Sequence, residues 1–489
     1  MIRLSIGITN LTPGWTSLFQ QMGILAEEIN FSKSLASSYS ALIINSDLDH
    51  SNIQKIHSFL TQSSGGLLLT KNYTTLFSSD RTSSQTKTEL PKNYSSRIKS
   101  FYLSSGLIYC LKFDPDKEFS NNKYGRKRFP FKTDIHPDEI VSDVDRDSLR
   151  LSLEILFKEL HYHRHLPFLS KWHSPTVKPF FAFRVDTDFG DKPSIQNLYA
   201  LAGKHNIPMT WFLHVRAHEE WLSYFHAMKN QEIALHGYEH GTSKSYEHVI
   251  NNIERGKQLM IDAGIEPKGF CVPYSIWNNT LAEILPKFNF KYSSEFTLGY
   301  DTLPFNPIHE HNQHPTLQIP IHPICTGSLG RKNASVDEMK EYFTITLEQN
   351  IAQLKNVIFY HHPLQPGLEI WDIIFKKVND AGFTKLTFSE IADFWQKRQN
   401  AHIEAFFDMD SSTLQCESNT PDLFLNISTK PSEFHILEAS KANSPLNSFD
   451  SIKTPPIKYL SSNTIKELNG NKFKLLKTSI MDWKNRIKL

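Results

Sequence analysis

The sequence is poor in features that would assign it to several specialised classes of protein. It has only four cysteines in 489 residues, and Cys110, Cys271, Cys325 and Cys416 are widely scattered. This usage suits a reducing compartment and excludes a cysteine-based zinc knuckle. No apolar run approaches the roughly 18–20 residues of a membrane helix. The first residues carry no long hydrophobic block and no small-residue cleavage site, so we interpret them as a strand rather than a signal peptide. We expect a cytoplasmic protein without a transmembrane segment.

An excess of charge of one sign is also absent. The chain has 53 Lys and Arg against 51 Asp and Glu, a formal net charge of +2. No basic field therefore argues for nucleic acid as a partner. The N-terminal part carries no Gly-x-Gly-x-x-Gly loop, no Walker loop and no nucleophile elbow. What is present, 39% apolar and 12% aromatic residues, is typical of a folded globular chain.

Three regions differ in the pattern of their apolar residues. In residues 1–165, apolar runs such as Leu4–Thr9, Ala41–Asn45 and Gly66–Thr70 alternate with helical patterns such as Thr16–Glu28. This alternation predicts a doubly wound α/β domain with a mostly parallel sheet, similar in pattern to Rossmann or flavodoxin-like domains. We expect this domain to serve in binding or in homo-oligomerisation.

The alternation resumes after a proline-containing segment, residues 166–178, which we interpret as a linker. Residues 179–400 contain about seven strand–helix units, the first strand being Phe181–Asp186. Such a series predicts a distorted parallel (β/α) barrel. In residues 401–489 the helical period fades, and a small β-rich appendage is expected there, with Lys472–Ile480 as one of its strands. The predicted fold class is therefore α/β.

Two carboxylates follow the first predicted strand of the barrel. Alternation along a strand places Arg184, Asp186 and Asp188 on one face at its carboxyl end. Neighbouring carboxylates repel each other unless a cation or a shared proton relieves the repulsion. On its own, an Asp-x-Asp pattern is more often a solvated acidic turn or a helix cap.

Two histidines four residues apart follow another predicted strand, Ile233–Leu235. On a helical turn, His236 and His240 share one face, so both imidazoles can reach one ion. All strand ends of a parallel barrel open on the same rim, which brings Asp188 to the same place. Two histidines and one carboxylate are a common catalytic zinc set that leaves a position open for water.

With both motifs in view, residues from about 179 to 399 resemble the polysaccharide deacetylase family, or NodB homology domain. Val185-Asp186-Thr187-Asp188 corresponds to a variant of the family's first motif in which one residue separates two aspartates. His236-Gly237-Tyr238-Glu239-His240 matches its His-x-x-x-His motif. The resemblance covers a little under half of the chain. It implies a distorted parallel barrel that acts as a hydrolase with a divalent metal, and zinc is the expected ion.

The resemblance also implies roles for the matching positions. Asp188, His236 and His240 would bind the metal, and Asp186 would act as the general base. A divalent ion lowers the pKa of water towards about 7, and a carboxylate that does not bind the ion can then take the proton. The oxyanion would rest on the metal and on a backbone N–H, and we assign Tyr274 to this substrate and oxyanion region.

The third motif of the family normally supplies an arginine that orients the base. The corresponding segment here is Phe270-Cys271-Val272-Pro273-Tyr274, so Cys271 stands at the arginine position. Arg184 lies on the same predicted strand face as Asp186, and our hypothesis is that it substitutes for the missing arginine at the substrate region. Cys271 itself is interpreted as a small buried residue.

The last motif of the family supplies a histidine as general acid to the leaving group. The predicted strand Val357–Tyr360 runs into His361 and His362, and His362, which precedes Pro363, is the better match. Alternation sends the two imidazoles to opposite faces, so only one can point inward. We therefore expect His362 to be the general acid.

These expectations combine into a metal-dependent hydrolase that removes N- or O-acetyl groups from a carbohydrate or a glycan intermediate. Two alternatives stay open: a hydrolase of another non-peptide C–N bond, and a catalytically silent barrel that binds sugar as a scaffold. The missing arginine of the third motif favours the scaffold. Retention of Asp186, Asp188, His236 and His240 together favours the enzyme.

Overall fold

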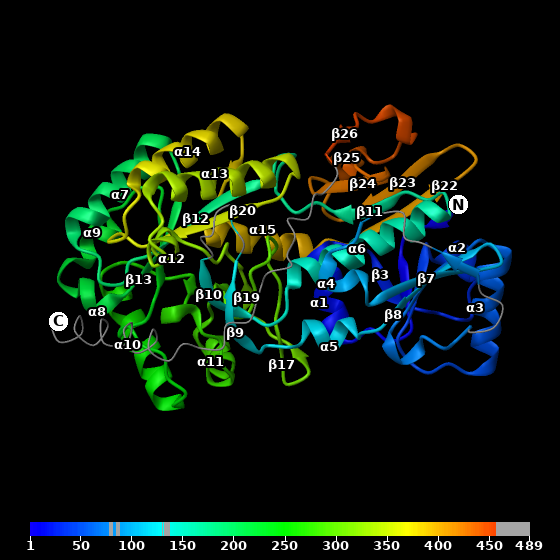
Figure 1. Ribbon diagram of the computed structural model, residues 1–489, viewed down its shortest axis with the longest axis horizontal. Coiled ribbons are helices and arrows are strands. Elements are labelled where there is room, and N and C mark those ends of the chain that lie inside the picture. Colours follow the sequence, from blue (N-terminus) through cyan, green and yellow to red (C-terminus); the bar gives the residue numbers. More distant parts are fainter. Residues whose placement is uncertain (78–81, 85–88, 130, 132–136, 456–489) are drawn as a thin grey trace.

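The computed structural model describes residues 1–489 except 78–81, 85–88, 130, 132–136 and 456–489. Two α/β regions lie side by side, an N-terminal one in blue and cyan and a second one in green and yellow (Figure 1). The C-terminal strands, in orange, lie above the N-terminal region in this view.

The sheet of the N-terminal region has the strand order β3-β2-β4-β5-β8-β7-β6. Its first five strands pair in parallel, and β7 and β6 add two antiparallel strands at one edge. All residues of β4, β5 and β8 are buried, as in a sheet covered by helices on both faces. The strands are β3 (Ala26–Glu28), β2 (Ile6–Ile8), β4 (Ala41–Ile44), β5 (Gly66–Leu69), β8 (Gly106–Leu111), β7 (Ile98–Leu103) and β6 (Thr82–Ser84). The helices of this region are α1 (Pro13–Met22), α2 (Leu35–Ser38), α3 (His50–Gln62), α4 (Lys92–Ser95), α5 (Pro115–Phe119) and α6 (Arg146–His163), and a hairpin is formed by β9 (Tyr124–Arg128) and β10 (Asp138–Ser142).

The helix predicted over Thr16–Glu28 is wrong in its second half. Helix α1 ends at Met22, and Gly23, whose φ of 72° is left-handed, gives the helix a glycine C-cap. Three residues after this glycine, Ala26–Glu28 form the edge strand β3. The apolar spacing continued across the glycine, and it therefore concealed the end of the helix.

The second region is a curled parallel half-barrel with the strand order β19-β16-β15-β14-β13-β12-β20. β21 pairs with β12 beside this path of seven strands. The two ends of the path are linked by a hydrogen bond of 2.9 Å from the His322 N–H to the Ile358 carbonyl. The strands are β12 (Phe180–Asp186), β13 (Met209–Leu213), β14 (Glu232–Leu235), β15 (Gly269–Phe270), β16 (Tyr292–Ser293), β19 (Leu317–Gln318), β20 (Val357–His361) and β21 (Thr384–Lys385). The helices are α7 (Lys192–His205), α8 (Val215–His218), α9 (Leu222–His226), α10 (Tyr246–Asp262), α11 (Asn279–Ile284), α12 (Thr326–Gly330), α13 (Val336–Ala352), α14 (Leu368–Ala381) and α15 (Phe388–Asn400), and a small hairpin is formed by β17 (Ile308–His309) and β18 (Asn312–Gln313).

Strand β12 lies between β13 and β20, and all seven of its residues are buried. Side chains alternate along a strand. Phe181 and Phe183 face α14, where their rings lie 6.1 and 4.8 Å from those of Phe375 and Trp371. The opposite face therefore carries Arg184 and its neighbours into the half-barrel.

The strands after α15 pair with segments from much earlier in the chain. One sheet has the order β1-β22-β23 and another the order β11-β24-β25-β26. β11 lies within the predicted linker 166–178, and β1 lies within the predicted N-terminal domain. The domain boundaries at 165, 178 and 400 stay predictions, and the predicted strand Lys472–Ile480 lies outside the described residues. The strands are β1 (Ile2–Arg3), β11 (Phe168–Lys171), β22 (Ile403–Asp408), β23 (Thr413–Ser418), β24 (Phe424–Lys430), β25 (Glu433–Glu438) and β26 (Ile452–Lys453).

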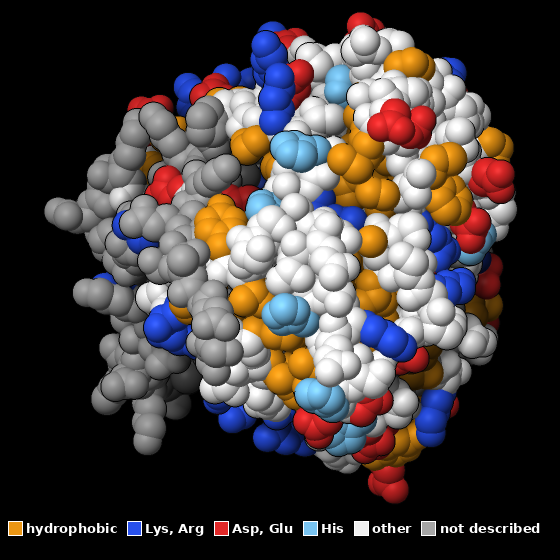
Figure 2. Space-filling model, turned by 90° about the vertical axis from the view of Figure 1, so that its right-hand side faces the viewer, with side chains coloured by type: hydrophobic (Ala, Val, Ile, Leu, Met, Phe, Trp, Pro, Cys, Tyr) orange, Lys and Arg blue, Asp and Glu red, His pale blue; other side chains and the backbone are white. Residues whose placement is uncertain are grey.

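The surface carries charges of both signs. On the face shown in Figure 2, Lys and Arg side chains are interspersed with Asp and Glu, in keeping with the net charge of +2. None of the helices in the described part of the chain combines the length and apolar character needed to cross a lipid bilayer.

Candidate active site

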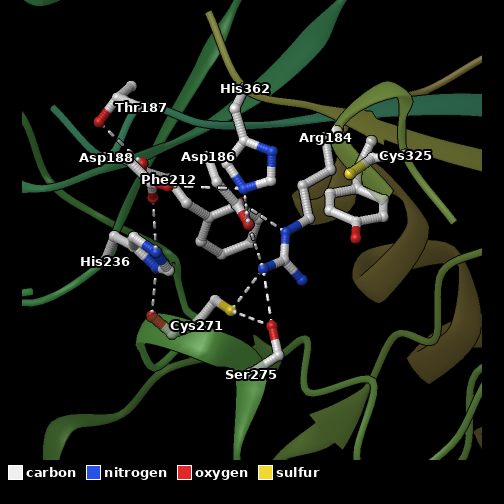
Figure 3. A network of polar contacts seen from close by, with 12 residues as sticks. Arg184, Asp186, Thr187, Asp188, Phe212, His236, Cys271, Ser275, Cys325 and His362 are labelled. Carbon is white, nitrogen blue, oxygen red and sulfur yellow. Dashed lines mark hydrogen bonds and ion pairs between the residues drawn. The ribbon is translucent and has the colours of Figure 1, made fainter. Parts of the chain in front are cut away.

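The carboxyl ends of the half-barrel strands meet at one rim, and the predicted site residues lie there. Asp186 is the last residue of β12, His236 directly follows β14, and His362 directly follows β20. Parallel strands point the same way, so these ends share one edge. Figure 3 shows Asp186, Asp188, His236 and His362 turned toward one another.

Asp188, His236 and His240 form a group with the geometry of a metal site. Their potential ligand atoms all lie within 4.8 Å of one another. The Oδ1 atom of Asp188 is 3.4 Å from His236 Nε2 and 3.1 Å from His240 Nε2. Burial opposes ionisation of Asp188, but His240, His362 and hydrogen bonds from both ligand histidines hold its pKa well below the usual range. The group thus offers one carboxylate and two imidazoles to a shared point.

The tautomer of His236 suits metal binding. Its Nδ1 atom lies 2.7 Å from the carbonyl oxygen of Cys271. A carbonyl oxygen only accepts, so Nδ1 carries a hydrogen, and Nε2, the ring nitrogen nearest Asp188, is the atom that would bind an ion. Such a contact from the second ring nitrogen is usual for histidines that bind metals. The three residues therefore fit a divalent ion.

The two histidines lie on a loop, and the helical turn predicted for them is wrong. Gly237 has a φ of 86°, and a Cβ at this position would come within 3.1 Å of the Asn252 side chain. Asn252 holds the loop, since its Oδ1 accepts a hydrogen bond of 2.6 Å from the Glu239 N–H. The loop brings the rings of His236 and His240 to a centroid distance of 5.4 Å. Two histidines four residues apart thus come together because Gly237 between them adopts a left-handed conformation, and not because they share a helix face.

Arg184 and Asp186 form a buried, bidentate ion pair. Arg184 donates from Nε to Asp186 Oδ1 at 2.6 Å and from Nη2 to Oδ2 at 2.7 Å. Burial raises the pKa of Asp186, but Arg184, followed by His236, more than offsets this effect, and the pKa lies below its usual value. Asp186 is therefore an ionised carboxylate whose orientation is fixed by two parallel hydrogen bonds.

Cys271 lies against the guanidinium group of Arg184. The Nη2 atom of Arg184 is 2.7 Å from Cys271 Sγ and 2.9 Å from Ser275 Oγ. Nη1 donates to the Ser294 carbonyl oxygen at 2.6 Å. Cys271 is fully buried, and burial raises the pKa of its thiol well above the usual value. The small thiol leaves the space that the guanidinium group fills (Figure 3).

Glu295 belongs to the same buried network, and the sequence analysis missed it. Its Oε1 accepts a hydrogen bond of 3.0 Å from the Val272 N–H. Burial raises the pKa of Glu295 from 4.5 to about 8, against the opposing effects of this hydrogen bond and of Arg184. The available signal was weak: an acidic residue two positions after the two-residue strand β16.

The two histidines at the end of β20 point in different directions. His362 Nε2 lies 3.9 Å from Asp186 Oδ2 and 3.6 Å from Asp188 Oδ2. Burial opposes its charge, but Asp188 and neighbouring groups raise the pKa of His362 to about 10. His361 instead lies 3.2 Å from Thr326 Oγ1 and packs against Trp371, and burial lowers its pKa to about 3. The structure brings His362 to the carboxylates and turns His361 away from them.

Tyr274 lies beside the metal-site histidines. It has a φ of 63° in the turn after β15, and its ring lies 5.1 Å from that of His240. Of the seven predicted site residues, the structure thus gathers six (Arg184, Asp186, Asp188, His236, His240 and His362) around two carboxylates and places Tyr274 against the edge of this cluster.

Comparison with known proteins supports the resemblance seen in the motifs. Residues 185–293 match the polysaccharide deacetylase family model. This segment contains both the aspartate pair and the histidine pair. The family resemblance is therefore confirmed for this segment. No curated protein sequence matches the chain significantly.

Solved structures with a similar course of the chain have low sequence identity. A Mycobacterium smegmatis protein assigned as a polysaccharide deacetylase is 17% identical over 47% of this chain and 94% of its own, with a TM-score of 0.40. A Pseudomonas aeruginosa PAO1 protein with the same assignment is 14% identical over 46% and 93%, also at 0.40. A Bacillus anthracis pseudoenzyme of the CE4 family is 17% identical over 45% and 70%, at 0.33.

Proposed function

We propose that this protein is a metal-dependent hydrolase that removes acetyl groups from an N- or O-acetylated carbohydrate or glycan intermediate. The observation that carries the proposal is the convergence of Asp188, His236 and His240 beside a second carboxylate, Asp186, that is held by Arg184. The family match over residues 185–293 supports the same class of reaction.

Asp188, His236 and His240 would hold the ion, and zinc fits a set of one carboxylate and two imidazoles. When bound, a divalent ion lowers the pKa of water and polarises the acyl carbonyl. The chain supplies the remaining functions. Tyr274, at the edge of the site, lines the side on which the acyl group and its developing negative charge would lie.

Asp186 is the proposed general base. It is ionised, and both of its oxygens accept hydrogen bonds from Arg184. A carboxylate fixed in this way can accept the proton of an attacking water without reorienting. Arg184 stabilises the charged form of Asp186 and so keeps it ready at neutral pH.

His362 is the proposed general acid. The carboxylates of Asp188 and Asp186 lie 3.6 and 3.9 Å from His362 Nε2 and favour the protonated imidazole. It can therefore give its proton to the departing amine or alkoxide oxygen. Asp186 and His362 thus have complementary roles, since the carboxylate accepts a proton and the imidazolium releases one.

The position of Arg184 argues against the scaffold alternative. Cys271 replaces the arginine expected from the family's third motif, but the guanidinium group of Arg184 fills the space beside it at 2.7 Å from Sγ. A site that only binds sugar has no need for a buried ion pair between Arg184 and Asp186 beside the candidate metal ligands. Hydrolysis of another non-peptide C–N bond uses the same groups and differs only in the substrate.

The test measures acetate release by the full chain with a panel of acetylated sugars. We expect turnover to disappear when a chelator strips the protein and to return with added zinc. Asp188→Asn is expected to lose the metal. Asp186→Asn should keep the metal and lose about 10²–10⁴-fold in turnover.

Three results would contradict the proposal. A protein that binds glycan equally well without metal and releases no acetate would be a scaffold. Turnover of cyclic or linear amides in place of acetylated sugars would support a hydrolase of another non-peptide C–N bond. Full activity of Asp186→Asn would exclude Asp186 as the base.

A further inference from the structure

The backbone of Asp188 adopts a conformation that needs support. Its φ of 43° is left-handed, a region that costs a residue with a Cβ about 1–2 kcal/mol and that Asp enters more readily than most. Asp188 comes after the end of β12, so sheet pairing does not hold it. Something outside the strand must keep its carboxylate directed at His236 and His240.

A third buried histidine contacts this residue. His214 directly follows β13, and its Nδ1 lies 2.8 Å from the carbonyl oxygen of Asp188. A carbonyl oxygen only accepts, so Nδ1 of His214 donates. The backbone N–H of His214 also donates to Thr187 Oγ1 at 3.0 Å. One residue thus holds two successive positions of the loop that carries Asp188.

The packing around His214 leaves its ring little freedom. The side chain is buried, and its ring lies edge-on to Phe189 at 4.9 Å and 5.5 Å from the ring of His240. His218 supports the arrangement from the next turn, because its Nδ1 lies 2.7 Å from the His214 carbonyl and its Nε2 3.1 Å from the Gly190 carbonyl. The imidazole of His214 therefore lies in one place, with its donor aimed at Asp188.

We propose that His214 is a positioning residue, which fixes the left-handed backbone of Asp188 so that the carboxylate faces the two ligand histidines. The inference rests on the proposed function, since it gives His214 a part in building the metal site. An apolar side chain of similar volume would fill the same space but would leave the Asp188 carbonyl without its donor. The hydrogen bond, rather than the bulk of the ring, is the feature that matters.

The experiment compares His214→Leu and His214→Asn in the full chain. The amide nitrogen of Asn occupies nearly the place of Nδ1, whereas Leu has no donor. Zinc affinity is measured on the metal-stripped protein by competition with a chelator of known affinity. We expect about 10–100-fold weaker binding for His214→Leu, as is typical when a partner of a metal ligand is lost, and affinity close to wild type for His214→Asn.

A spectroscopic readout separates positioning from general stability. Cobalt replaces zinc, and its d–d absorption reports the ligand geometry. The spectrum should change in His214→Leu and stay the same in His214→Asn. If His214→Leu does not fold, His214→Gln takes its place, because the amide of Gln lies one bond farther out and misses the Asp188 carbonyl.

His161 provides the matched control. It is also buried, and its Nδ1 lies 2.7 Å from a backbone carbonyl, that of Phe157 in helix α6. His161→Leu should lose stability but keep the zinc affinity and cobalt spectrum of the wild type. Equal zinc affinity in His214→Leu and wild type would overturn the inference and leave the proposed function intact. A wild-type protein that binds no metal would instead remove the proposed function itself.

Discussion

Arg184 is the residue on which the chemistry of Asp186 depends. Its guanidinium group makes two parallel hydrogen bonds to the carboxylate and also contacts three other residues, Cys271, Ser275 and Ser294. A lysine is a point charge on a flexible stem and cannot reproduce this planar fork.

The first prediction concerns this fork. Arg184→Lys keeps a positive charge and should lower kcat by about 10²-fold, since a base displaced by about 1 Å loses that much. Arg184→Ala should lower kcat more than Arg184→Lys does, without removing the metal. Acetate release and zinc content are measured on the same samples.

Unchanged turnover in either variant would show that Arg184 does not orient the base. A second change tests the space beside Cys271. Cys271→Arg introduced into Arg184→Ala should restore part of the turnover, because a guanidinium group would again lie beside Asp186.

Glu295 gives a prediction about pH. Its pKa is raised to about 8 by burial, so the folded protein holds a proton that the unfolded chain loses above pH 4.5. Unfolding therefore releases a proton between pH 4.5 and 8, and the stability of the wild type falls as pH rises through this window. Glu295→Gln cannot ionise and should not show this loss, which amounts to roughly 1.4 kcal/mol per unit of pKa difference.

Urea unfolding of wild type and Glu295→Gln at pH 5, 6.5 and 8 checks this. The free energy of unfolding of Glu295→Gln, relative to that of the wild type, should increase from pH 5 to 6.5 and again from pH 6.5 to 8. Parallel pH profiles would mean that Glu295 is ionised in the folded protein at neutral pH.

The sequence revealed the residues that belong to motifs and missed those that do not. The alternation of β12 placed Arg184 beside Asp186, and the motifs placed Asp188, His236 and His240 at one rim. Ser294 and His214 carry no pattern, and they reach the site only because the half-barrel brings separate strand ends together. Contacts across more than a hundred residues, such as that between Arg184 and Ser294, leave no local trace.

At the scale of single elements, strand β20 decides which of two adjacent histidines takes part. It pairs with β12 from Val357 to His361, and side chains alternate along it. His361 ends the strand and is buried against α14, so His362 is the one that faces the carboxylates. Periodicity along a strand could be predicted from the sequence.

This gives the third prediction. His362→Ala should lower kcat by about 10²–10⁴-fold because the leaving group loses its acid. His361→Asn, a change at the neighbouring residue, should retain turnover and lose only stability. Steady-state kinetics on both variants decide the matter, and the reverse result would mean that β20 is shifted by one residue.

Short and irregular elements were harder to predict than long ones. Strands β15, β16 and β19 have two residues each, too few for any periodicity. The positive φ of Gly237 and Asp188 breaks the alternation at the points where the ligands emerge. Backbone conformations of this kind depend on contacts such as those of Asn252 and His214, which the spacing of apolar residues does not encode.

At the scale of the whole molecule, the N-terminal region supports the segment that carries part of the site. Helix α6 places Arg146 against the Leu298 carbonyl and Arg150 against Asp301. Gln21 of α1 donates to the same carboxylate at 3.1 Å. Residues 298–301 follow Ser294 and Glu295 within a few positions in the chain. The contacts from α1 and α6 therefore fix the segment that supplies Ser294 and Glu295 to the network around Arg184.

The fourth prediction tests this support. Arg150 Nη2 lies 2.9 Å from Asp301 Oδ1 in a buried pair, and loss of one partner of such a pair costs about 3–5 kcal/mol. Arg150→Met should therefore lower the free energy of unfolding by this amount at pH 8. Burial already raises the pKa of Asp301 to about 6, so a protonated Asp301 makes the loss smaller at pH 5.

Denaturant unfolding at both pH values measures the effect. Adding Asp301→Asn to Arg150→Met should recover part of the stability, because no buried charge is then left alone. An equal loss at both pH values would show that Asp301 stays ionised without its arginine.

The pairing of β1 with β22 has a consequence for the protein during its synthesis on the ribosome. Arg3 pairs with Phe406, so β1 leaves the ribosome about 400 residues before the strand with which it pairs. At about 5–20 residues per second of translation, the nascent segment waits on the order of tens of seconds before that ladder can close. The segment that contains β1 should consequently remain open to proteases and chaperones until the half-barrel has been synthesised.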